Sequence, residues 1–155
     1  METSAPLQIE KMESLRIARV SVMSESPEIA AFKALIDWAK KNEPEPLNSV
    51  RLFGFNDPCP EPGQKVYEYE AWMTVSENAR KEGDVSIIDH PGGTYAVIFT
   101  PLIKIGEAWL QLYNAVKKSD YKYGAGPALE EALTDPINTP FDKAEMKLYF
   151  PIIKA

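Results

Sequence analysis

Apolar and polar residues alternate in the first part of the chain, and the spacing then changes to that of a helix. Residues 15–22 (LRIARVSV) alternate and are rich in β-branched side chains, as is typical of a half-buried strand. Ser26-Pro27-Glu28 follows with the composition of a helix start, because proline suits the first helical position and an acid favours the positive end. The apolar positions that then recur at helical spacing are Ile29, Phe32, Ile36 and Ala39. The proline-rich NEPEP predicts that this helix ends at about Lys41.

Two further strands are predicted before the middle of the chain, and the second half repeats the same order of elements. VRLFGF and VYEYEAWMTV predict strands on either side of the proline-rich turn NDPCPEPG. GGTYAVIFT then predicts a strand, Pro101 opens the next predicted helix, and the segments ALEEAL and MKLYFPII predict two more strands. The apolar stripe of the second helix comprises Ile105, Ala108, Trp109, Leu112 and Val116.

The two halves resemble each other at a nearly constant offset. AFKALIDWAKK lies over AWLQLYNAVKK, so that Phe32 corresponds to Trp109 at a distance of 77 residues (109 − 32). FGFNDP lies over EALTDP, so that Pro58 corresponds to Pro136 at a distance of 78 residues (136 − 58). Neither half is large enough to bury its apolar face alone. We therefore predict an α+β fold in one domain, residues 1–155, whose β-α-β-β halves (about 15–75 and 86–153) form one antiparallel sheet with two helices.

Composition excludes several classes of function. The 155 residues carry a net charge of −6 without a Lys/Arg stripe, which argues against direct nucleic-acid binding. Cys59 and His90 are the only residues of their types, so the chain has no intrachain disulfide and no zinc site built from several cysteines or histidines. No membrane-length apolar stretch or signal peptide is visible, so we expect a cytoplasmic protein without metal or cofactor.

An ordered set of motifs resembles the GyrI-like small-molecule-binding family, which includes the effector-binding domains of AraC-type and MerR-type regulators. The motifs are FGFNDP, YEAWMTV, PGGTYAVI, GEAWLQLYNAV, LEEALTDP and LYFPI. The resemblance implies the duplicated fold, a central cleft for varied, often cationic or hydrophobic compounds, and a pocket glutamate at the position of Glu130. Because no helix-turn-helix segment is visible in the sequence, we expect the module to stand alone, without a DNA-binding segment.

The chain departs from the family pattern at several places. The tyrosine of the family's E-x-Y pattern falls on Ala132, and Lys147 stands in the last strand where the family often has an acid. SESPE and FTPLI replace the His-x-Gly-Pro-Tyr motif that often precedes each helix. These departures leave the identity of the ligand open.

Glu130 and Glu131 point to opposite faces of the predicted strand, because side chains alternate along a strand. Glu130 shares its face with Ala128 and Ala132, whose small side chains leave room for a ligand, although either acid could instead be a solvated edge residue. We predict Glu130 as the pocket acid. The other candidate ligand-binding residues are Trp109, Tyr95, Tyr149, Trp72 and Glu70, and the alternative for each of them is a core residue.

Three functions are consistent with these residues. The first is a binding module in which a carboxylate and aromatic rings hold an amphipathic, cationic aromatic compound. The second is a hydrolase of small electrophiles in which Glu130 acts as general base on water. The third is a protein-binding, gyrase-inhibitor-like module. We favour the binding module, since no nucleophile with its own base is visible in the sequence.

Overall fold

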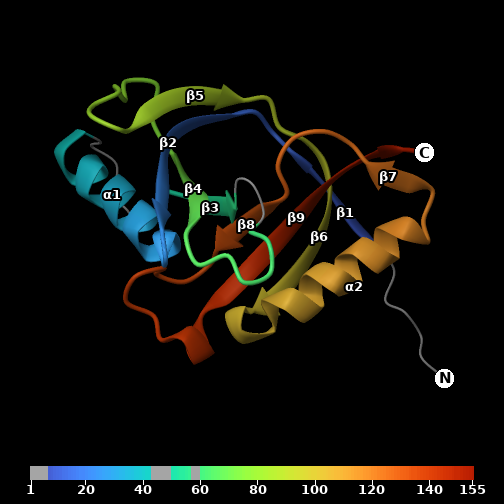
Figure 1. Ribbon diagram of the computed structural model, residues 1–155. Helices are drawn as coiled ribbons and strands as arrows, with labels where there is room; N and C mark the ends of the chain where they lie inside the picture. Colours follow the sequence, from blue (N-terminus) through green and yellow to red (C-terminus); the bar gives the residue numbers. More distant parts are fainter. Residues whose placement is uncertain (1–6, 43–49, 57–59) are drawn as a thin grey trace.

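The computed structural model describes residues 7–42, 50–56 and 60–155, and it shows a large antiparallel sheet with two helices (Figure 1). The order of the strands across the sheet is β1-β6-β9-β8-β3-β4-β2-β5, and β7 pairs with the far end of β9. This confirms the predicted fold class. The strands are β1 (Gln8–Met12), β2 (Leu15–Ser24), β3 (Leu52–Asn56), β4 (Tyr67–Thr74), β5 (Ser86–His90), β6 (Gly93–Pro101), β7 (Tyr121–Tyr123), β8 (Leu129–Ala132) and β9 (Glu145–Lys154).

The strand order is the same in both directions outward from the central β3–β8 pair. On one side come β4, β2 and β5, and on the other side come β9, β6 and β1. β1 precedes β2 in the chain but pairs with β6, whereas β5 precedes β6 but pairs with β2. The predicted pairing of two halves would give this order. The residue-by-residue correspondence stays a prediction, and Pro58 lies outside the described residues.

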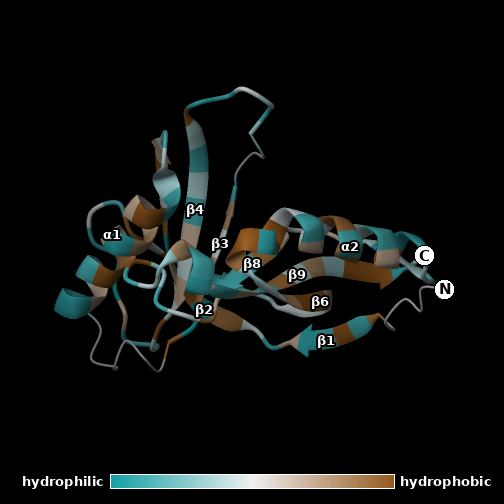
Figure 2. Ribbon diagram, turned by 90° about the horizontal axis from the view of Figure 1, so that it is seen from below, coloured by the Kyte–Doolittle hydropathy of each residue, from teal (hydrophilic) through white to brown (hydrophobic). Residues whose placement is uncertain are grey.

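The helices α1 (Pro27–Asn42) and α2 (Ile105–Lys117) pack on the sheet through short apolar stripes. In α1 the buried positions include Ala31, Leu35 and Ala39, and in α2 they are Ala108, Leu112 and Val116. Each of the three positions in α2 follows its counterpart in α1 by 77 residues (108 − 31, 112 − 35 and 116 − 39). In Figure 2 the two helices lie on opposite sides of the molecule, with β3 and β8 between them.

The register shows that both helices cover the same face of the sheet. Paired residues on neighbouring antiparallel strands point their side chains to the same side. Leu148 of β9 packs in the cluster that includes α2, and Ala71 of β4 packs in the cluster that includes α1. One row of paired residues joins them, running Leu148, Glu130, Gly54 and Ala71. Glu130 therefore lies in the row that connects the two helix-covered regions.

One local prediction is wrong, and several short elements were not predicted. Pro101 does not open a helix but is the last residue of β6, with an extended ψ of 147°. A short 3-10 helix, η2 (Leu102–Lys104), follows it, and α2 begins only at Ile105. A second 3-10 helix, η3 (Phe141–Lys143), precedes β9. The strands β1, β5 and β7 were not predicted, because their side chains are mostly exposed or half-buried and lack the apolar pattern of a buried strand.

Candidate functional site

Glu130 lies on the helix-covered face of β8, and two neutral donors hold its carboxylate. The phenol of Tyr69 on β4 donates to Oε1 at 3.2 Å, and the indole N–H of Trp109 on α2 donates to Oε2 at 3.2 Å. The donors reach it from opposite sides, because one comes from the strand under α1 and the other from α2 itself.

Gly54 makes room for the Tyr69 phenol. It is paired with Glu130 across β3 and β8, and with Ala71 across β3 and β4. A Cβ at position 54 would lie only 2.0 Å from the Tyr69 hydroxyl oxygen and 2.4 Å from Cζ. Glycine is therefore needed here for the close approach of a ring, since real Cβ atoms are never this close to another atom.

A cavity of about 460 Å³ opens beside Glu130 on this face. This volume lies within the range of about 300–1,000 Å³ that small-molecule pockets occupy. Its apolar wall comes from the start of α1, from η2, from the segment before β9 and from β9 itself. The apolar side chains of that wall include Ile29, Phe32, Leu102, Phe141 and Met146.

The charged side chains on the cavity wall are all acidic. Glu28, Glu130 and Asp135 line the cavity, and no lysine or arginine among the described residues does so. Asp135 is held within its own loop, where it accepts from the backbone N–H of Ile137 at 2.9 Å and from the Asn138 side chain at 2.9 Å. The cavity is therefore apolar with an excess of negative charge.

Burial raises the pKa of Glu130 above its usual value of 4.5. The hydrogen bonds from Trp109 and Tyr69 lower that pKa in part, and the negative charge of Glu28 raises it. Burial also raises the pKa of the Tyr69 phenol well above its usual value of 10.0, with Glu130 as the next cause. The phenol is thus a proton donor to the carboxylate over the whole ordinary pH range.

The neighbouring acid, Glu131, lies on the opposite face and is fully engaged. Arg51 donates to it through Nε at 3.0 Å and through Nη2 at 3.1 Å, and the Tyr149 phenol donates at 2.5 Å. The hydrogen bond to Glu131 is the main cause that raises the pKa of Arg51. Glu131 and Arg51 therefore form a hydrogen-bonded ion pair, which the Tyr149 phenol also joins, and this arrangement is typical of a structural role.

Four of the predicted site residues lie on this opposite face and not beside Glu130. Tyr95 and Tyr149 are buried and meet edge to face, with ring centroids 5.7 Å apart. Trp72 donates its indole N–H to Glu70 at 2.6 Å, also on this face. The expectation that Tyr95 and Tyr149 form walls around Glu130 is therefore not met. The reason is strand alternation: Leu148, not Tyr149, is paired with Glu130.

His90, which is the single histidine of the chain, is the last residue of β5 and is buried. Its Nε2 lies 2.9 Å from the Tyr95 hydroxyl, and burial lowers its pKa. The ring also packs against Trp72 with centroids 5.0 Å apart. His90 is thus part of the core on the opposite face.

The sequence matches the profile of the GyrI-like small molecule binding domain over residues 6–153. The chain belongs to the GyrI-like family. A search of curated proteins by sequence found no match.

Solved structures with low sequence identity share the fold of this GyrI-like chain. The EcmrR C-terminal domain has a TM-score of 0.74 and 16% identity, and the match covers 96% of this chain and 97% of that one. In the EcmrR–DNA complex the match has a TM-score of 0.75 and 15% identity, and it spans 96% of this chain but only 57% of the EcmrR chain. A hydrolase from Listeria innocua is also similar, with a TM-score of 0.64 and 12% identity over 96% of this chain and 94% of that one. SAV2435 bound to tetraphenylphosphonium has a TM-score of 0.55 and 12% identity, again over 96% of this chain and 94% of that one.

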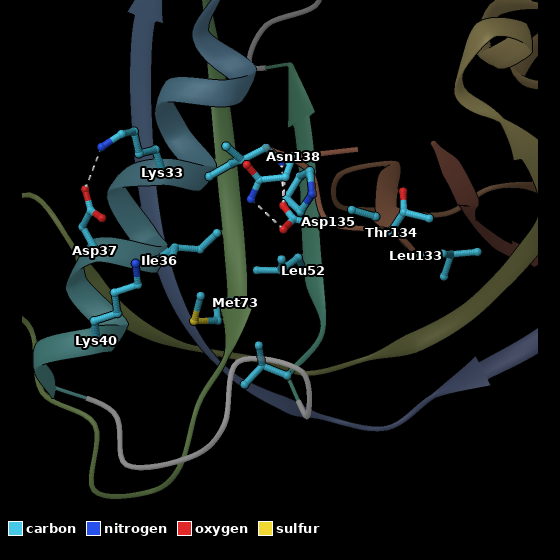
Figure 3. A pocket seen from close by; sticks show the side chains of 14 residues that line it. Lys33, Ile36, Asp37, Lys40, Leu52, Met73, Leu133, Thr134, Asp135 and Asn138 are labelled. Atoms are coloured by element: carbon cyan, nitrogen blue, oxygen red, sulfur yellow. Dashed lines mark hydrogen bonds and ion pairs between the residues drawn. The ribbon is translucent and has the colours of Figure 1, made fainter. Parts of the chain in front are cut away.

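A second hollow of about 640 Å³ lies on the other side of the loop that follows β8 in this GyrI-like domain (Figure 3). Its charged wall residues include Lys33 and Asp37, which form an ion pair at 3.3 Å, and Lys40. The two hollows share a partition, whose residues are Ala132, Thr134, Asp135, Pro136 and Ile137. Lys33 and Lys40 of α1 therefore line the second hollow and not the acidic cavity.

Sequence reasoning missed several residues of the GyrI-like cavity. Glu28 was interpreted only as an acid at a helix start, and Phe32 only as an apolar helix position. Tyr69 was part of a predicted strand without a role. The signal for it was the Tyr-x-Tyr spacing of Tyr67 and Tyr69, which puts two phenols on one face of a strand.

Neither a metal centre nor a membrane helix is found in the part of the chain that the structure describes. No group of three or more His, Cys, Asp or Glu side chains there could hold a metal ion. No helix of those residues is long and apolar enough to cross a bilayer.

Proposed function

We propose that this GyrI-like protein senses or sequesters small amphipathic organic cations in the cavity beside Glu130. The observation that carries the proposal is the composition of the cavity wall. It combines apolar and aromatic side chains with carboxylates, and none of the described lysines or arginines lines it. An apolar body with a positive charge matches such a wall, because it fills the space and supplies the missing counter-charge.

The partners of Glu130 support its role as the charged contact. Its two hydrogen bonds come from an indole and a phenol. Both donors are neutral, so neither balances the negative charge of the ionised carboxylate. The charge is poorly solvated, as the raised pKa indicates, and a cation that enters the cavity would relieve that cost. Elements of both predicted halves line the cavity, including α1 and β4 from the first and β8 from the second.

The neighbour SAV2435, solved with tetraphenylphosphonium, makes this lipophilic cation a suitable probe. We expect wild-type protein to bind it in isothermal titration calorimetry. Glu130→Gln should reduce the affinity about thirtyfold or more, because loss of one charge from a desolvated pair costs about 2 kcal/mol or more. Glu131→Gln is the matched control, since it removes the same charge one residue away on the other face.

Thermal unfolding should show that both variants are folded at the titration temperature. Equal affinities for wild type and Glu130→Gln would remove Glu130 from the site. A loss confined to Glu131→Gln would move the ligand to the opposite face of the sheet.

Hydrolysis of a small electrophile is the second candidate, and one observation favours it. A carboxylate whose pKa is raised toward neutrality is a better general base, and Glu130 has such a pKa and two fixed donors beside it. Two structural neighbours are described as hydrolases from Listeria innocua. A turnover screen with hydrolysable epoxides and activated esters separates the candidates: turnover that disappears in Glu130→Gln supports an enzyme, and binding without turnover supports the module.

A further inference from the structure

We propose that Glu28 is a second cation contact in the Glu130 cavity, so that the protein prefers ligands with two separated basic groups to ligands with one. The inference rests on the proposed function, since it concerns the same cavity. It adds a residue of α1 that sequence reasoning treated as a helix-start acid.

The contacts of Glu28 direct it to the cavity. Its Oε1 accepts the phenol O–H of Tyr67 at 2.5 Å, and the residue lines the cavity together with Glu130. The contact with Tyr67 joins α1 to β4, so the carboxylate is held at the sheet. An acid that served only the positive end of the helix would not need a partner on the neighbouring strand.

Two phenols of one strand, β4, each hold one of the two carboxylates. Tyr67 and Tyr69 are two residues apart on β4 and point to the same face, and each donates its phenol to a different glutamate. Two residues along a strand span about 7 Å. The two acids are therefore fixed by anchors that are separated by about the length of a four-carbon diamine.

The electrostatics agree with two acids in one site. The charge of Glu28 raises the pKa of Glu130, and the charges of both glutamates contribute to the raised pKa of Tyr67, which burial and the bond to Glu28 bring to about 12. Both phenols donate their only proton to these carboxylates and supply no positive charge. Among the described residues that line the cavity no cation offsets the pair. A ligand with two cationic groups would compensate both acids at once.

A pair of probes that differ by one charge tests the inference. N-benzylputrescine and N-benzylbutylamine have the same aromatic ring, the same secondary amine and the same four-carbon chain, and only the first carries a terminal amine. We expect wild-type protein to bind the diamine about tenfold or more tightly than the monoamine in calorimetry, because a second charge-assisted contact forms. In Glu28→Gln this ratio should fall to near one, with the monoamine affinity changed by less than about threefold.

Two variants complete the design. Glu25→Gln removes an exposed acid just before the same helix and outside the cavity wall, so it should leave the ratio at its wild-type value. Glu130→Gln should weaken both probes.

The outcomes separate this inference from the proposed function. Binding of the monoamine that depends on Glu130, with an unchanged ratio in Glu28→Gln, overturns the role of Glu28 and leaves the proposed function standing. An equal drop of the ratio in Glu25→Gln and Glu28→Gln also overturns it, because the effect would then be general electrostatics. If neither probe nor tetraphenylphosphonium binds the wild-type protein, the proposed function and this inference both fail.

Discussion

The space beside Gly54 gives a sharp test of how the Glu130 site is assembled. In Gly54→Ala the new Cβ would lie 2.0 Å from the Tyr69 hydroxyl oxygen, 2.4 Å from Cζ and 2.5 Å from Cε2. All three distances are well below contact, so the Tyr69 ring must move. The ring is only 3% exposed and packs against Phe32 with centroids 5.9 Å apart, which leaves little room for that movement.

Overpacking of this kind costs about 1–3 kcal/mol, whereas replacement of a strand glycine by alanine alone is favourable by about 0.5–1 kcal/mol. We therefore expect Gly54→Ala to lower the free energy of unfolding by about 1–2 kcal/mol in urea titrations. The displaced phenol should also lose its bond to Glu130 and alter the binding of tetraphenylphosphonium.

The background Tyr69→Leu separates the clash from other effects of the added methyl group. Without the ring the clash is absent, and Gly54→Ala should become neutral or stabilising in that background. A double-mutant cycle measures the difference. The reasoning is refuted if Gly54→Ala changes stability by less than about 0.5 kcal/mol, or if its cost is the same with and without the Tyr69 ring.

Three further predictions concern the helix, the ion pair and pH. Leu112 lies on the buried face of α2 and is only 2% exposed. Leu112→Ala should therefore lower the free energy of unfolding by about 2–5 kcal/mol in urea titrations. A change below about 0.5 kcal/mol would contradict that packing. Glu131→Gln should cost about 1–3 kcal/mol in the same assay, since Arg51 loses its charged partner, and an unchanged stability would make the pair dispensable. Because the pKa of Glu130 is raised above 4.5, the folded state retains a proton that the unfolded state has released, so stability falls as pH rises from about 4.5 through the folded pKa. Glu130→Gln should abolish that part of the pH profile, and tetraphenylphosphonium affinity should rise with pH over the same window only in wild type.

The parts of the fold that follow from local pattern were predictable from the sequence. Alternation and helical spacing identified β2, α1, β4, α2 and β9 with small errors at the ends. β1 and β5 were missed because they are short and have their partners in the other half of the chain, where no local pattern records them. Pro101 was misassigned because proline fits both the end of a strand and the start of a helix.

The candidate site was predictable only in part, for a similar reason. Strand alternation correctly separated Glu130 from Glu131. It could not show which face of β9 or β6 would join Glu130, since that depends on the register between strands. A shift by one residue in that register would have put Tyr149 beside Glu130, whereas the observed pairing puts Leu148 there.

The two adjacent acids differ in the charge of their partners, and this difference bears on what each can do. Glu131 is bonded to the guanidinium of Arg51, so its charge is balanced within the protein and a ligand would have to displace a cation to reach it. Glu130 is bonded to a phenol and an indole, which satisfy its oxygens geometrically but leave its charge unbalanced. A protein that needed Glu130 only for stability would gain more from an apolar residue at this position, because burial of an uncompensated carboxylate is unfavourable. Stability therefore does not explain why an acid with neutral partners stands at position 130 beside a cavity. Binding of a cationic ligand would explain it.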